Sequence, residues 1–102
     1  MSEHAARVAN RDAGTWIAAR QPFTGHHMSG QIVRRFGPVP TGRLEPEHAE
    51  KLRQAVGLGC VYVVFSYATP IGWWAPATGW VVPDARYSVT TRRHQHIVRA
   101  AI

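Results

Sequence analysis

Hydrophobic positions are densest between residues 60 and 67, where the segment CVYVVFSY is apolar or aromatic on both of its alternating faces. Such a segment is typical of a strand in the middle of a sheet that is covered on both sides. The runs IGWW, GWVV and RYSVT follow, and PATG and PDA between them contain proline, glycine and aspartate, which favour turns. The pattern predicts antiparallel strands across residues 60–90.

Two earlier segments have weaker patterns. Residues 1–20 are rich in alanine and other good helix formers, which predicts a helical segment. Ser2 and Asp12 are its candidate caps, and Gly14 favours two short helices over one. After a turn at residues 25–27, the segment GQIVRRF, residues 30–36, predicts a short strand that the following prolines end.

The segment EPEHAEKLRQAVG has the spacing of an amphipathic helix over residues 45–56. Pro46 suits the first turn, the acidic residues are concentrated near the start, and Gly57 is a candidate end. Apolar or weakly polar residues recur three and four positions apart, so this helix packs through one side and leaves its charges in water. That side comprises His48, Leu52, Ala55 and Val56.

Residues 91–102 predict a final helix with two chemically different sides, capped by the hydroxyl of Thr90 or Thr91. Apolar spacing places one set of residues together, namely His94, Ile97, Val98, Ala101 and Ile102. The opposite side is basic and comprises Arg92, His96 and Arg99, with Arg93 at its edge.

These elements predict one α+β domain spanning residues 1–102. An antiparallel sheet of four or five strands packs against the N-terminal helical segment, the middle helix and the C-terminal helix. The length of 102 residues fits one modest core and is too short for two. No apolar run approaches the roughly 20 residues of a membrane span, so we expect no membrane partner.

The compartment is inferred from the start of the chain and from its cysteine content. Residues 1–20 lack the continuous apolar core of a secretory signal. The single Cys60 cannot form an internal disulfide, which fits a reducing compartment. We therefore expect the protein in the cytoplasm.

The formal net charge is +6, and the basic residues are eleven arginines and one lysine. Such an excess attracts partners that carry phosphate, because arginine forms bidentate contacts with phosphate oxygens. A coding bias in a GC-rich genome produces the same ratio without selection for binding. The charge therefore favours a nucleic-acid partner without establishing one.

The histidines and the cysteine do not form a familiar catalytic or metal site. Helical residues separated by two positions differ by about 200° around the axis, so His94 and His96 cannot chelate one ion. His26 and His27 lie in a turn with no carboxylate or cysteine at ligand spacing. Cys60 begins an apolar strand, where we expect a buried structural thiol. We expect no metal, no cofactor and no catalytic residue.

Tryptophans could provide a different kind of nucleic-acid contact. Trp73, Trp74 and Trp80 would form a base-stacking platform if they were exposed, although such residues more often fill a core. Strand alternation sends Trp73 and Trp74 to opposite faces, so one of them is a candidate exposed aromatic.

The segments SYATPIGWW, residues 66–74, GW at residues 79–80 and RYSVTTRRHQ, residues 86–95, resemble a group of short uncharacterised proteins of tailed phages and prophages. Those proteins carry similar SYxTPIAW and YSVTTSxHQ segments. Here Gly72 replaces the usual alanine, and Arg92 stands where serine is common. The resemblance implies an origin in a phage or prophage of a GC-rich actinobacterial host and names no reaction.

The shared motifs also contain polar residues that could converge where strands end. Their hydroxyls and imidazole would suit a ligand or phosphate pocket. The set comprises Tyr67, Thr69, Tyr87, Thr90, Thr91 and His94.

Our first hypothesis is a binding module that is not an enzyme and associates with nucleic acid through Arg92, Arg93, His96 and Arg99. Arg34, Arg35 and Arg86 are candidate additional contacts. A phage effector that binds a host protein is the alternative. A small nuclease that uses His94 or His26 with an arginine ranks third.

Overall fold

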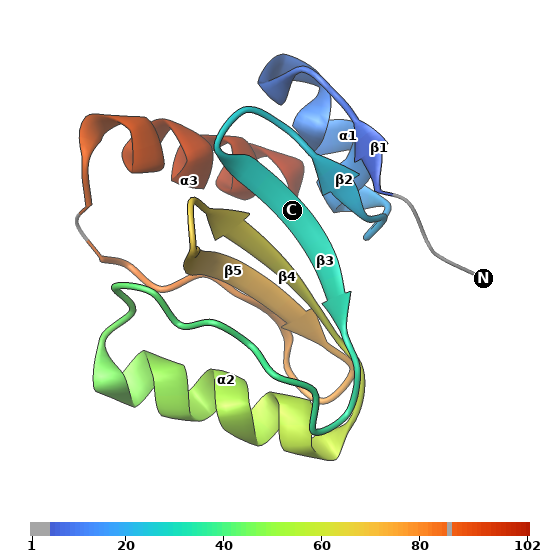
Figure 1. The fold of residues 1–102 in the computed structure, drawn as a ribbon, viewed down its shortest axis with the longest axis vertical. Coiled ribbons are helices and arrows are strands. Elements are labelled where there is room, and N and C mark those ends of the chain that lie inside the picture. The colour runs from blue at the N-terminus through green and yellow to red at the C-terminus, as the bar shows by residue number, and fades with distance from the viewer. Residues whose placement is uncertain (1–4, 86) are drawn as a thin grey trace.

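The structure, a computed structural model, describes residues 5–85 and 87–102. A six-stranded sheet with the order β1-β2-β3-β4-β5-β6 forms its centre. α2 (Pro46–Leu58) covers one face of this sheet, while α1 (Ala13–Ala18) and α3 (Val89–Ala101) cover the other (Figure 1). The predicted α+β class is confirmed, with six strands where the sequence predicts four or five.

The two additional strands lie at one edge of the sheet. β1 pairs in parallel with β2, and every other neighbouring pair is antiparallel. β1 and β2 are two residues long each, so neither is long enough to show an alternating pattern in the sequence. The strands are β1 (Ala6–Arg7), β2 (Phe23–Thr24), β3 (Met28–Val33), β4 (Val61–Ser66), β5 (Thr69–Ala75) and β6 (Gly79–Val81).

β4 is the central strand that the sequence predicts, paired with β3 on one side and β5 on the other. All six of its residues are buried. Its side chains alternate between the two faces, so Val63 and Phe65 pack toward α2 while Tyr62 and Val64 pack toward α1 and α3.

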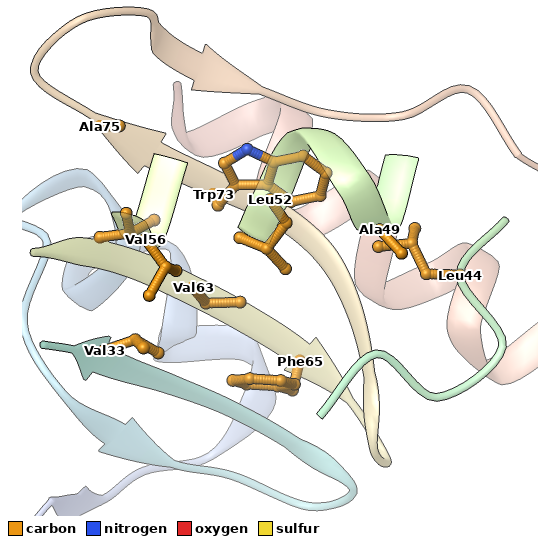
Figure 2. Close-up of a cluster of buried hydrophobic side chains, with 10 residues drawn as sticks. Val33, Leu44, Ala49, Leu52, Val56, Val63, Phe65, Trp73 and Ala75 are labelled. Carbon is orange, nitrogen blue, oxygen red and sulfur yellow. The ribbon is translucent and has the colours of Figure 1, made fainter. Parts of the chain in front are cut away.

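The core on the α2 side is apolar. Leu52 and Val56 of α2 pack onto Val63 and Phe65 of β4 and onto Trp73 of β5 (Figure 2). On the other side, Ile17 of α1 and Val98 of α3 pack onto β4 and β5, with Trp74 and Trp80 partly buried against them. The sheet thus separates two cores, and adjacent residues Trp73 and Trp74 belong to different ones.

The N-terminal prediction is only partly correct. Ala6–Arg7 is a strand, Asn10–Asp12 is a 3-10 turn, and the α-helix is limited to Ala13–Ala18. Asp12 is the N-cap residue of α1, although its side chain makes no capping hydrogen bond. Pairing with β2 outweighs the helix propensity of the alanines. The predicted cap Ser2 lies outside the described residues.

The middle helix is confirmed but ends later than predicted. Gly57 lies within α2, which continues to Leu58, and Gly59 follows as its C-cap residue. Its buried residues are Ala49, Leu52 and Val56, so Ala49 takes the place predicted for His48. Cys60 belongs to the connection between α2 and β4 and is exposed. The prediction of a buried thiol is therefore wrong, because strand pairing begins only at Val61.

The last helix begins earlier than predicted, and residues 87–88 are not a strand. Ser88 is the N-cap, with its Oγ accepting the Thr91 backbone N–H at 3.3 Å. Thr90 and Thr91 are therefore not the caps, and Thr91 uses its hydroxyl elsewhere. Ile102 is exposed, whereas Gln95 is buried and donates to the Ala85 carbonyl at 3.1 Å.

β3 covers Met28–Val33, so the predicted strand at residues 30–36 is shifted. Gly37 N donates to Arg34 O at 2.7 Å, which makes residues 34–37 a turn. Among the described residues, no helix is long and apolar enough to cross a membrane.

Candidate functional site

α3 carries two chemically opposed faces, as its spacing predicts. Thr91, His94 and Val98 are buried against the sheet. The outward side exposes three arginines and one histidine, which we call the basic face: Arg92, Arg93, His96 and Arg99. The functional question is what each face does.

The buried face forms a hydrogen-bonded group that we call the His94 network, comprising Asn10, Ser66, Thr91 and His94. His94 Nδ1 lies 2.7 Å from Ser66 Oγ, and Ser66 Oγ lies 2.9 Å from Thr91 Oγ1. On the other side of the imidazole, His94 Nε2 lies 3.3 Å from Asn10 Nδ2. The network therefore ties α3 to the end of β4 and to the 3-10 turn.

The contacts of Asn10 fix the protonation of His94. Asn10 Oδ1 accepts the His26 backbone N–H at 2.8 Å, and Asn10 Nδ2 donates to the His26 carbonyl at 2.9 Å. The amide nitrogen is therefore the group that faces His94, and it can only donate. His94 Nε2 must accept, so the proton of the neutral ring is on Nδ1 and is donated to Ser66 Oγ.

Electrostatics favours the same neutral form. Burial lowers the pKa of His94 below its ordinary value, and the neighbouring His27 and His26 lower it further. A protonated His94 would also present a second N–H to the Asn10 amide nitrogen, which would place two donors against each other.

A serine hydroxyl beside an imidazole also raises the question of catalysis. Ser66 is 1% exposed and His94 is 3% exposed, so neither can contact a substrate in this structure. The network is therefore structural as it stands, and the same burial removes His94 from the nuclease hypothesis. Sequence reasoning missed Ser66 and Asn10, and only their tertiary positions reveal the role.

The basic face lies beside a groove of about 780 Å³, which α3 forms with residues 84–85 of the preceding segment. Arg92, Arg93 and Arg99 all contribute to its walls. Arg99 Nη2 lies 3.7 Å from Asp84 Oδ1, and the aspartate side chain is fully exposed. An exposed pair of this length is weak, so it leaves Arg99 available to another anion.

The other predicted arginines do not extend this face. Arg34 and Arg35 belong to the turn after β3, and Arg35 Nε donates to the Gly57 carbonyl at the end of α2 at 3.2 Å. α2 covers the opposite face of the sheet from α3 (Figure 1). Arg86 lies outside the described residues. A single interface that includes Arg34, Arg35 and the basic face is therefore wrong.

The predicted pocket of hydroxyls and imidazole does not form as a unit. Thr91 and His94 meet in the His94 network, and Tyr67 lies nearby, stacked on His27 with ring centroids 4.7 Å apart. Thr90 is exposed, while Thr69 Oγ1 accepts the Arg43 backbone N–H at 2.9 Å.

Tyr87 has different neighbours from the other members of that predicted pocket. Burial raises its pKa, and so does the Glu45 carboxylate before α2. Its hydroxyl is buried and has no hydrogen-bond partner among the described residues. The six residues predicted for this pocket therefore lie at several separate places in the fold.

The tryptophans do not provide an exposed stacking platform. Trp73 is fully buried in the α2-side core. Trp74 is half-buried, with the Arg20 guanidinium 4.1 Å from its ring centroid, and Trp80 packs edge-on against Tyr62. Trp73 is therefore inaccessible to a base, and Trp74 and Trp80 are only partly accessible.

Metal-ligating side chains come together at one place within the described ranges. One group of three has its ligand atoms close together, namely Glu45, Glu47 and His48 at the start of α2. His26, His27 and His94 form no such group, although they are neighbours. Exposed acidic groups of this kind are common without an ion, so Glu45, Glu47 and His48 do not identify a metal centre.

Comparison with known proteins identifies a family but no function. The model of a family of unknown function, DUF8033, matches residues 11–99. No curated protein and no solved structure matches the chain.

Proposed function

The chain belongs to the family of unknown function DUF8033, and we propose that it is a nucleic-acid-binding module that contacts backbone phosphates through the basic face of α3. The observation that carries this proposal is the exposure of Arg92, Arg93, His96 and Arg99 on one side of a helix whose other side is anchored in the core.

The anchoring supports the proposal because it presents the cations at low entropic cost. α3 is tied to β4 and to the 3-10 turn through the His94 network and packs on the sheet through Val98. A preorganised helix loses little further freedom on binding. Arginine guanidinium groups on such a helix match phosphate oxygens in a bidentate geometry.

The chemistry of the face favours binding that depends little on base sequence. Phosphate contacts position a protein on nucleic acid, whereas sequence is read by contacts to base edges or by stacked rings. The basic face consists of three arginines and one histidine, Trp73 is fully buried, and Trp74 and Trp80 are partly buried. We therefore propose that DNA or RNA binds here mainly through charge. The phage-like motifs SYATPIGWW and RYSVTTRRHQ favour a bacterial host cytoplasm as the setting.

Fluorescence anisotropy with labelled single-stranded DNA, duplex DNA and RNA across a salt series tests this function. The test variant is Arg92→Ala/Arg93→Ala/Arg99→Ala. The matched control is Arg34→Ala/Lys51→Ala/Arg53→Ala, which removes the same charge from residues at or near α2. Each lost phosphate contact should reduce the magnitude of the salt slope of log affinity by about 0.7 to 0.9.

We expect the test variant to lose that slope and the control to keep it. The proposal is wrong if the wild-type protein shows no salt-sensitive binding at low ionic strength. It is also wrong if the two triple variants lose affinity equally, since that would show an effect of net charge alone.

A further inference from the structure

The turn at residues 34–37 places an aromatic side chain where glycine is normally favoured. Gly37 N donates to Arg34 O at 2.7 Å, and Phe36 occupies the third position of this turn with φ +59°. A left-handed backbone conformation is strained for any residue with a Cβ, and bulky residues rarely adopt it. The strain brings no burial in return, because Phe36 is 75% exposed.

The backbone of this turn is fixed to the end of α2. Phe36 N donates to the Val56 carbonyl at 3.0 Å, and Arg35 Nε donates to the Gly57 carbonyl at 3.2 Å. The Phe36 ring lies over Gly57, where an added Cβ would be 3.6 Å from a ring carbon. The Arg35 guanidinium lies 4.8 Å from the ring centroid. The ring is thus presented at a defined position.

A second exposed apolar residue and a hollow lie at the same end of α2 as this turn. Leu58, the last residue of α2, is also 75% exposed. It borders a mainly apolar hollow of about 300 Å³ between α2 and the β5–β6 turn. Ala55, Cys60, Ala75 and Pro76 contribute to the lining. The hollow has room for one large apolar side chain from another molecule.

The charged side chains around this region are mostly basic. Arg34 and Arg35 lie in the turn, and Lys51 and Arg53 lie on the exposed side of α2. Residues 51–60 and 34–37 contain no aspartate or glutamate. The nearest acid along the helix, Glu50, lies 3.8 Å from Arg53 in an exposed pair.

We infer that Phe36, Leu58 and the adjoining hollow, which we call the Phe36 surface, form a docking site for a protein partner. That partner presents a large apolar side chain flanked by carboxylates. Exposed aromatic and aliphatic anchors beside a pocket are typical of the centre of a protein interface. The cationic rim gives the complementary charge, and backbone strain is common at functional sites.

Charge also distinguishes this partner from a second copy of the chain. Two copies meeting symmetrically through the Phe36 surface would place Arg34, Arg35, Lys51 and Arg53 against their own counterparts. Like charges across an interface oppose association. The surface lies on the α2 side of the sheet, away from the basic face of α3, so it goes beyond the proposed nucleic-acid function (Figure 1).

A random dodecapeptide display library selected on the wild-type protein provides the probe. We expect enriched peptides to combine a large apolar residue with neighbouring aspartates or glutamates. An enriched peptide should bind Phe36→Gly and Leu58→Ser at least about tenfold more weakly than wild type. Val89→Ser, which changes an exposed apolar residue on α3, should bind it as wild type does.

Two further measurements separate a binding role from a structural one. Phe36→Gly should melt at the wild-type temperature or above it, because glycine relieves the left-handed backbone. Saturating peptide should slow alkylation of Cys60, which lines the hollow and is the only cysteine. Nucleic-acid binding by Phe36→Gly should equal that of wild type, so failure of one function does not imply failure of the other.

Four results would overturn the inference. These are the absence of any enriched peptide, enrichment without acidic residues, unchanged affinity in both Phe36→Gly and Leu58→Ser, and a lower melting temperature of Phe36→Gly. Sedimentation tests one alternative. If the wild type self-associates and Phe36→Gly does not, the Phe36 surface binds a second copy of the chain and the inference is also wrong.

Discussion

The two faces of the sheet are covered in different ways. On the α2 side, apolar side chains such as Leu52, Phe65 and Trp73 fill the contact. On the α3 side, apolar packing surrounds a network in which His94 bonds to Ser66 and Asn10. An apolar layer tolerates substitution by similar volumes, whereas a buried polar network requires particular atoms in particular protonation states. The comparison predicts that the two faces respond differently to mutation and to pH.

The largest effect is expected on the apolar side. Phe65 is buried beneath α2, so Phe65→Ala should lower the free energy of unfolding by about 3 to 5 kcal/mol, enough to unfold many small domains. Chemical denaturation measures this, with Phe36→Ala as a control at an exposed phenylalanine. A Phe65→Ala protein of nearly wild-type stability would show that the α2-side core is placed wrongly.

The polar side should respond to loss of a single amide. Asn10→Ala leaves His94 Nε2 and the His26 backbone without their partner, so it should cost about 1 to 3 kcal/mol. Gln31→Ala, at an exposed residue, should change stability by less than about 0.5 kcal/mol. Equal denaturation midpoints for wild type and Asn10→Ala would show that the His94 network does not contribute to stability.

These two faces also differ in how far the sequence predicts them. Val61 to Ser66 and the spacing of Leu52 and Val56 are local patterns, so the central strand and α2 follow from them. The pairing of Asn10 with His94 spans 84 positions and depends on the hairpin that carries His26, so no local pattern contains it. A polar network is specified by tertiary geometry.

The candidate site shows the same limit. The outward direction of Arg92, His96 and Arg99 follows from helical periodicity. Arg34 and Arg35 lie away from the basic face because their turn contacts α2, on the other side of the sheet from α3. The composition of the chain does not predict on which side of the sheet a segment lies. Ser88, Thr90 and Thr91 each carry a hydroxyl that could cap α3, and the sequence does not say which one does. The structure distinguishes them, because Ser88 accepts the Thr91 backbone N–H and the Thr91 hydroxyl contacts Ser66.

A smaller effect is expected at the start of α3. Ser88→Ala removes the oxygen that accepts the Thr91 backbone N–H, so it should cost about 0.5 to 2 kcal/mol. Thr90→Ala, which removes an exposed hydroxyl two residues later, should leave stability nearly unchanged. If Thr90→Ala proves the more damaging of the two by thermal denaturation, the assignment of Ser88 as the cap is incorrect.

The smallest effect concerns mild acid. The pKa of His94 is lower in the folded than in the unfolded state, so unfolding takes up a proton as pH falls. Stability from this group is present above the unfolded pKa of about 6.5 and is lost as pH falls toward the folded value. Melting temperatures measured across this range should decline in wild type.

Asn10→Asp supplies the matched variant for that pH dependence. A carboxylate oxygen facing His94 Nε2 would accept a hydrogen bond and favour the protonated ring, which raises the pKa of His94. A raised folded pKa contributes stability below the unfolded pKa that is lost as pH rises, so the slope should reverse. If Asn10→Asp and wild type show the same pH profile, His94 does not face residue 10 in solution.

The central claim is that α3 binds nucleic acid with its outward side while its inward side holds the fold. The most direct measurement is an NMR titration of the labelled protein with a short DNA duplex at low salt. We predict that the largest amide and side-chain shifts occur at Arg92, Arg93, His96 and Arg99, while Val63 and Leu52 stay unchanged. Shifts concentrated at Arg34 to Phe36, or no shifts at all, would contradict the account.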